Sequence, residues 1–140
     1  MSGEKRLWGG RFSGATDAGF AAFNRSYGFD RRLLASDVRG SLAHAEGLRE
    51  AGVLTEDEAR RISDGLREIL RRASADEAYT DDESAEDVHS FIEARLIELV
   101  GDAGRRLHTG RRRNDQVATA IRLWLRDEID AALASLRGVR

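Results

Sequence analysis

The stretch TEDEARRISDGLREILRR, residues 55–72, decides the fold class of this 140-residue chain. Thr55 followed three residues later by Glu58 is the pattern of a capping box, in which the two residues hydrogen-bond each other's backbone N–H groups at a helix start. Behind the box, apolar residues recur at helical spacing and form one stripe: Ile62, Leu66, Ile69 and Leu70. We therefore predict an amphipathic helix over about residues 56–72.

The residues before this stretch predict an antiparallel partner helix over about residues 37–51. Its apolar residues recur at i, i+4, i+7 and i+10: Val38, Leu42, Ala45 and Leu48. Ser36 or Asp37 is suited to cap the start, and Gly52 ends the run.

After a polar, acidic loop (73–85), a third helix is expected over about residues 85–100. Ser84 and Asp87 offer its start, and Gly101 closes it. Its apolar stripe is expected to consist of Val88, Phe91, Ile92, Leu96 and Leu99. Residues 102–112 are expected to form a second loop.

The last helix begins near Arg113 or Asn114 and keeps helical spacing to the final residues. Its apolar stripe is wide, and about 25 residues is long for a helix of a small globular domain. We expect it to be the first long helix of a larger helical bundle, cut within a longer architecture. An exposed stripe of this width also predicts that the chain self-associates or is only partly ordered.

The composition agrees with an all-α fold. The chain has no Pro and 14 Gly, with 41% apolar and 34% charged residues. No run is apolar enough to span a membrane, and the N-terminus has no secretory signal. The lack of Cys excludes disulfides and thiolate catalysis, and favours the cytoplasm. A net charge of −2 does not favour nucleic-acid binding.

Residues 1–35 differ from the rest because they carry six of the nine aromatic residues and several glycines. Such a composition predicts an extended arm anchored by its aromatic side chains, with a short helix over about 17–25. The expected organisation is thus an N-terminal domain over 1–112, which includes the arm, and the beginning of the long helix over 113–140.

Two constellations are candidates for chemistry. In the first, Glu86, His89 and Glu93 share one polar helix face, where flanking carboxylates favour an imidazolium that could orient or relay charge. The alternative is an ordinary solvated helix face. A metal site at His89 and Glu93 is weaker because no third ligand stands at a useful spacing, so we predict no metal.

The second constellation is HTGRRRNDQ, residues 108–116, which delivers three Arg, an Asn and a Gln to a helix N-terminus. Unpaired backbone N–H groups and guanidinium forks both bind carboxylate or phosphate, so the stretch predicts an anion site. A solubilising basic loop and a contact with nucleic-acid phosphates are the alternatives, the last disfavoured by the net charge.

Five motifs together resemble the argininosuccinate lyase family, part of the fumarase and aspartase superfamily, in that family's order and spacing. They are Leu7–Phe12 (LWGGRF), Phe23–Ser26 with Asp30, Asp37–Ser41 (DVRGS), Glu86–His89 (EDVH) and His108–Gln116 followed by Val117–Thr119. The resemblance runs from Leu7 to the last residue and corresponds to the N-terminal part of the family.

The resemblance implies a cofactor-free, reversible elimination of argininosuccinate to L-arginine and fumarate, in arginine biosynthesis. It implies a cytoplasmic homotetramer with a core of long helices and active sites shared between three subunits. Ser26, Arg113 and Asn114 match substrate-binding residues of the family; Gln116 lies beside them, and His89 matches a His near the site. The family's catalytic Ser and assisting His lie beyond Arg140, so this chain alone is predicted to have no lyase activity, and no catalytic residue is assigned within it.

Two departures from the family stand near the site: Arg112 replaces a usual Ser and Ala120 a frequent Asp. Three alternatives remain open. They are a non-catalytic, crystallin-like homologue, a sibling lyase of the same superfamily, and a helical module that binds nucleic acid through the Arg residues of 105–113.

Overall fold

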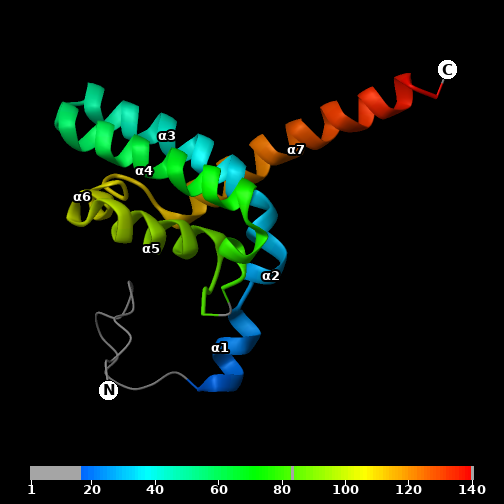
Figure 1. Ribbon diagram of the computed structural model, residues 1–140, viewed down its shortest axis with the longest axis horizontal. Helices are drawn as coiled ribbons and strands as arrows, with labels where there is room; N and C mark the ends of the chain where they lie inside the picture. The colour runs from blue at the N-terminus through cyan, green and yellow to red at the C-terminus, as the bar shows by residue number, and fades with distance from the viewer. Residues whose placement is uncertain (1–16, 83, 140) are drawn as a thin grey trace.

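The computed structural model describes residues 17–82 and 84–139, and within them the chain is all-α, as the sequence predicts. The elements in chain order are α1 (Ala18–Asn24), α2 (Tyr27–Asp30), the 3-10 turn η1 (Arg31–Leu33), α3 (Leu34–Glu50), α4 (Glu56–Ala75), the 3-10 turn η2 (Glu77–Thr80), α5 (Val88–Val100), α6 (Asp102–Arg106) and α7 (Arg113–Arg137). Figure 1 shows α3 and α4 running side by side above α5, and α7 projecting away to the C-terminus.

The α3–α4 hairpin has the local chemistry expected of it. The chain reverses at Gly52, whose φ of 70° is a left-handed value that glycine adopts without strain. Thr55 Oγ1 then accepts from Glu58 N at 3.3 Å, and the Glu58 carboxylate accepts from Thr55 N at 2.9 Å. The predicted capping box is confirmed, and α4 begins at the next residue, Glu56.

The core lies where α3, α4 and α5 meet. Its largest fully buried apolar side chains are Val38, Ile62, Leu66, Ile69, Val88, Phe91 and Leu96. Gly65 lets α4 and α5 approach closely, because a Cβ there would lie 2.8 Å from Leu96 Cδ1 and 2.9 Å from Val100 Cγ1. The predicted stripe of the third helix is wrong at one residue, since Leu99 is 37% exposed and Val100 is buried in its place.

From residue 17 onward, the N-terminal region differs from the predicted extended arm. Trp8 and Phe12 lie outside the described residues, and from Ala18 onward the chain is mostly helical. The expected short helix is present as α1, but its aromatic side chains do not anchor it: Phe20 is 61% and Phe23 87% exposed. Tyr27 is the buried aromatic residue of this region, packed 5.2 Å from the Phe91 ring.

The two predicted loops also contain helical turns. Asp102–Arg106 forms α6, which Gly104 presses against the backbone of Ile97. The acidic loop is shorter than expected, because α4 extends to Ala75 and η2 follows it. Such single turns are set by tertiary packing and carry too few residues to show a period.

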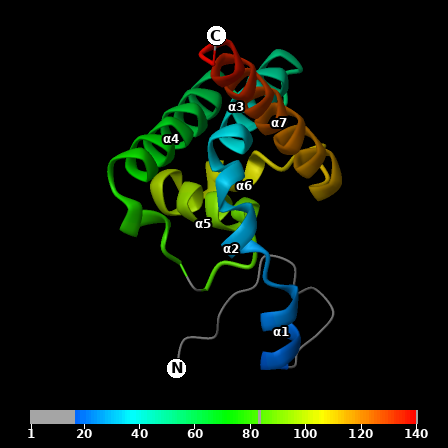
Figure 2. The same cartoon turned by 90° about the vertical axis from the view of Figure 1, so that its right-hand side faces the viewer.

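Helix α7 spans two environments. Its first part packs against α3, with Gln116 and Ala120 buried. From Trp124 to Asp127 one face of the helix still contacts the other elements, because Trp124 packs against the core and Asp127 pairs with Arg39 of α3. Farther on, the helix projects away from them (Figure 1), and Figure 2, which looks at its C-terminal end, shows α3 between α4 and α7. We call residues 27–120 the body and residues 121–137 outer α7. Outer α7 exposes an apolar series: Ile121, Leu125, Ile129, Leu133 and Leu136.

Candidate functional site

The start of α5 is joined to the α2 region by hydrogen bonds. The Glu86 carbonyl accepts from Ser26 N at 2.9 Å and from Tyr27 N at 3.1 Å. Asp30 Oδ1 accepts from Val88 N at 2.9 Å, and Asp30 Oδ2 accepts from Ser26 Oγ at 2.6 Å. Ser26 is therefore held at the N-terminal end of α5, although Glu86 lies 60 positions further along the chain.

The start of α7 meets the same place through a charged pair. Arg113 Nη1 lies 2.7 Å from Asp87 Oδ1 and 3.0 Å from Asp87 Oδ2. Asp87 also caps α5 by accepting from Ser90 N at 2.7 Å. Burial alone would raise the pKa of Asp87, but the hydrogen bonds from Ser90 and the Arg113 guanidinium outweigh it and hold that pKa below its usual range.

The segment between α6 and α7 is held to the body by two histidines. His108 Nε2 lies 3.0 Å from Glu93 Oε2, and His44 Nε2 donates to the Thr109 carbonyl at 3.2 Å. Burial and the neighbouring Arg111 guanidinium lower the pKa of His44, which favours the neutral ring at neutral pH. These contacts fix the segment that leads into Arg113.

Helix α7 is capped by its own first turn. Asp115 Oδ1 accepts from Arg112 N at 2.8 Å, so the cap position belongs to Arg112. Asn114 lies in the first turn, exposed, and its amide makes no hydrogen bond to the described residues. Capping of α7 by Asn114 is therefore excluded by the structure, and contact of its amide with a ligand stays a prediction.

A group of buried polar side chains surrounds the Asp37 carboxylate, which is 0% exposed. Gln116 Nε2 lies 3.0 Å and 3.1 Å from its two oxygens, and His89 Nδ1 lies 3.1 Å from Oδ2. Arg111 Nη2 lies 3.8 Å from Asp37 Oδ1, while Arg111 Nη1 donates to Ser41 Oγ at 2.9 Å.

The predicted polar face of Glu86, His89 and Glu93 is therefore wrong. Helix α5 begins at Val88, so Glu86 precedes it, and His89 is 3% exposed and turned towards Asp37. Glu93 is paired with His108 from the segment after α6. Sequence period alone could not identify this burial, because the polar partners of His89 and Glu93 come from other elements.

The sequence-predicted residues thus fall into two neighbouring groups. Ser26 and Arg113 meet around the start of α5, where Asn114 follows on the first turn of α7. His89 and Gln116 meet on Asp37. Sequence reasoning missed Asp37 as a member and considered it a helix cap, but α3 begins earlier, at Leu34. A charged residue directly before the buried Val38 was the available signal.

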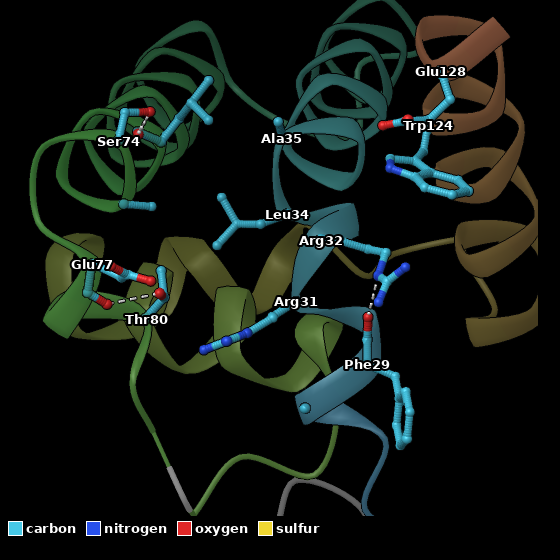
Figure 3. Close-up of a pocket in the computed structure, with 13 residues that line it drawn as sticks. Phe29, Arg31, Arg32, Leu34, Ala35, Ser74, Glu77, Thr80, Trp124 and Glu128 are labelled. Atoms are coloured by element: carbon cyan, nitrogen blue, oxygen red, sulfur yellow. Dashed lines mark hydrogen bonds between the residues drawn. The ribbon is translucent and has the colours of Figure 1, made fainter. Parts of the chain in front are cut away.

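Other kinds of site find less support. Among residues 17–82 and 84–139, no group of three His, Cys, Asp or Glu side chains is arranged to hold a metal ion. None of the helices in these ranges combines the length and apolar character needed to cross a membrane. A hollow of about 660 Å³ opens between η1, the end of α4 and α7 (Figure 3), lined by residues such as Arg31, Arg32 and Trp124, but it contains none of the predicted substrate-binding residues.

Known proteins resemble this chain over nearly its whole length. The sequence model of a protein family described as Lyase matches residues 10–138. An argininosuccinate lyase of Thermoanaerobacter sp. (strain X514) is 58% identical over 125 residues, which cover 89% of this chain and 27% of the relative. The same-named protein of Psychrobacter cryohalolentis is 53% identical over 130 residues, covering 93% and 28%.

A third protein of that name, from Thioalkalivibrio sulfidiphilus, is 55% identical over 137 residues, covering 97% of this chain and 29% of the relative. The chain therefore spans less than a third of the length of the curated relatives it matches.

Proposed function

Because this chain belongs to the lyase family, we propose that it forms the substrate-binding N-terminal part of an argininosuccinate lyase. The reaction is the reversible elimination of argininosuccinate to L-arginine and fumarate. The observation that carries the proposal is the meeting of Ser26, Arg113 and the first turn of α7 at the start of α5. The names of the relatives support the choice of substrate.

The reaction defines what such a site must do. A base removes a proton from the carbon beside one carboxylate, and that electron pair forms the C=C bond of fumarate. The C–N bond breaks, and the nitrogen takes a proton to leave in the guanidinium of arginine. Negative charge builds on the carboxylate as the proton is lost, so fixed donors must face that carboxylate.

Arg113 and Asn114 are suited to this task. A guanidinium binds carboxylate through two parallel N–H groups, and a helix N-terminus such as that of α7 carries partial positive charge. Arg113 already engages both oxygens of a carboxylate, that of Asp87. We propose that a substrate carboxylate shares or replaces this pairing, so that Asp87 keeps Arg113 oriented between turnovers.

These residues bind and polarise the substrate and do not abstract the proton. We therefore expect the 140-residue chain alone to release no fumarate from argininosuccinate. We also expect it to bind substrate without a cofactor. A measurable rate of fumarate release from the purified chain would contradict this assignment.

The experiment that tests the proposal uses a chimera, in which this chain replaces the matching 125 residues of the Thermoanaerobacter sp. protein. Arg113→Ala and Asn114→Ala are each expected to lower kcat/KM by about 100-fold or more, because removing one donor from a developing anion typically costs this much. Arg60→Ala is the matched control, since Arg60 is exposed on α4 and pairs with Asp57.

Light scattering and circular dichroism verify that each chimera assembles and folds. An Arg113→Ala chimera with the unchanged kcat/KM of the parent would contradict the proposed role. Turnover of another amino dicarboxylate in preference to argininosuccinate would indicate a sibling lyase instead.

We further propose that the protein is a cytoplasmic homo-oligomer, a tetramer as in the family, assembled through outer α7. Five apolar side chains along this helix are between 44% and 68% exposed: Ile121, Leu125, Ile129, Leu133 and Leu136. A continuous apolar face of this kind is characteristic of an interface. The wild-type chain is expected to self-associate in light scattering, and Leu125→Lys to shift it towards monomer. A wild-type chain that stays monomeric at high concentration would contradict assembly through this face.

A further inference from the structure

The Asp37 carboxylate is buried so completely that the molecule must compensate its charge internally. Its side chain has no exposed surface, and isolated buried carboxylates are strongly disfavoured. The compensation comes from elements far along the chain: His89 on α5, Gln116 on α7, and Arg111 just before α7. Asp37 thus contacts side chains from both helices whose N-termini form the proposed substrate site.

A carboxylate can only accept hydrogen bonds, and this fixes what its neighbours present to it. Gln116 lies with one group 3.0 Å and 3.1 Å from the two oxygens, so that group must be the amide nitrogen. His89 Nδ1 is 3.1 Å from Oδ2, so Nδ1 must carry a proton. Asp37 therefore selects both the amide orientation of Gln116 and the tautomer of His89.

With the amide of Gln116 in this orientation, one buried polar atom lacks a hydrogen-bond partner. Gln116 Oε1 is buried and has no hydrogen-bond donor among the described residues. A buried carbonyl oxygen without a donor is unfavourable, so this position favours an N–H group that approaches from outside the described chain. In His89 the nitrogen that remains free of Asp37 is Nε2.

We propose that Asp37 is a positioning residue: it holds His89 with the proton on Nδ1, and it holds Gln116 with Oε1 presented to an N–H donor of the substrate, of the guanidinium or ammonium class. The first half depends only on the contacts of Asp37. The second half rests on the function proposed above, because it assumes a nitrogen-bearing substrate at the α5–α7 junction.

Arg111 explains why a full charge is tolerated at this centre. Its guanidinium lies 3.8 Å from Asp37 and donates to Ser41, so the buried negative charge has a cationic neighbour. A carboxylate offers its neighbours acceptors only. A protonated carboxyl or an amide at position 37 would donate as well as accept, and both selections would be lost.

The first test reads the His89 ring directly by long-range ¹H–¹⁵N NMR on the labelled 140-residue chain. In the wild type, we expect Nδ1 to be protonated both at pH 8 and at pH 6. Asp37→Asn is expected to change the ratio of the two neutral tautomers by about tenfold, the effect of losing one charge-assisted hydrogen bond. It should also shift the side-chain amide signals of Gln116.

Ser36→Ala is the matched control, because Ser36 is equally buried on the preceding residue of α3 and makes no side-chain hydrogen bond to the described residues. It should leave the His89 and Gln116 signals unchanged. A wild-type His89 with its neutral proton on Nε2 would overturn the proposal, and this result is obtained even if Asp37→Asn fails to fold. Unchanged signals in a folded Asp37→Asn would overturn it as well.

The second test measures KM and kcat in the chimera. Asp37→Asn is expected to raise KM for argininosuccinate about tenfold with a smaller change in kcat, while Ser36→Ala stays at the parent values. If the NMR result holds and KM does not change, the substrate contact of Gln116 is wrong while the positioning of His89 stands. If the parent chimera is inactive, the proposed function fails, and the NMR result still decides the role of Asp37.

Discussion

The body and outer α7 have similar helical patterns and opposite environments. In α4, Ile62, Leu66 and Ile69 follow one another along a stripe that is 0% exposed. In outer α7, Ile121, Leu125 and Ile129 follow one another in the same manner and are each more than two-fifths exposed. The spacing of apolar residues thus identifies which face of a helix is suited to packing. Whether that face is buried depends on the presence of another element that packs against it.

The largest expected difference between the body and outer α7 is in the free energy of unfolding that is lost when an Ile is replaced by Ala. Ile62→Ala in the body is expected to lower the free energy of unfolding by about 3 kcal/mol, since it removes packed methyl groups and leaves a cavity. Ile129→Ala in outer α7 should change it by less than about 0.5 kcal/mol in the dissociated chain, where Ile129 is 49% exposed. Urea unfolding of dilute chain, followed by circular dichroism, measures both.

Equal losses for Ile62→Ala and Ile129→Ala would mean that outer α7 is packed as tightly as the body. A loss at Ile129 that grows with protein concentration would instead agree with the proposed assembly through this helix.

A second expectation concerns backbone approach within the body. Gly65→Ala is expected to destabilise by about 1–2 kcal/mol, because the new methyl group would overlap Leu96 and Val100. Gly47→Ala on α3 is the matched control: no atom lies within 4 Å of its Cβ position, so the better helix propensity of Ala should stabilise by about 0.5–1 kcal/mol.

Thermal unfolding of the two glycine variants at one pH distinguishes them, because the change in stability is expected to have opposite signs. If both substitutions stabilise, α4 and α5 can separate without cost, and the close approach at Gly65 is not a constraint on the body.

The smallest expected effect concerns the ion pair that ties α7 to the body. The folded pKa of Asp87 is lower than the unfolded value of 3.8, so its stabilisation is present above about pH 3.8 and is lost as the pH falls through the folded value. Asp87→Asn is therefore expected to cost about 1 kcal/mol at pH 7, and less as the pH falls below 3.8.

Urea unfolding at pH 7, 4.5 and 3 measures this dependence on pH. Asp64→Asn serves as the control because Asp64 forms an exposed i,i+3 pair with Arg67, and it should change stability little at any of the three pH values. A difference between Asp87→Asn and wild type that grows towards pH 3 would contradict the lowered pKa.

Much of the fold was predictable because its signals are local. The Thr55–Glu58 box, the stripe of α4 and the start of α7 near Arg113 depend on residues three or four positions apart, and each is present in the structure. The short elements α2, α6 and η2 were missed since a single turn carries no period. Within residues 17–35 the expected anchoring was wrong at Phe20 and Phe23, because aromatic composition alone does not identify what the side chains contact.

The site was predictable in its residue types and less so in its arrangement. The basic run before α7 indicated an anion site, and the resemblance to a lyase family selected Ser26, Arg113 and Asn114. The assignment of His89 to a polar face was wrong, because its partner Asp37 lies 52 positions away in the chain. Gln116 meets Asp37 across 79 positions.

The amino-acid sequence by itself determined the helices, their apolar faces and the kind of anion that the start of α7 suits, because caps, period and charge act between near neighbours. Only the tertiary structure decided which polar residues are buried together. Asp37, His89 and Gln116 are polar residues, and they can lie inside the protein only because α5 and α7 bring their donors to one carboxylate on α3.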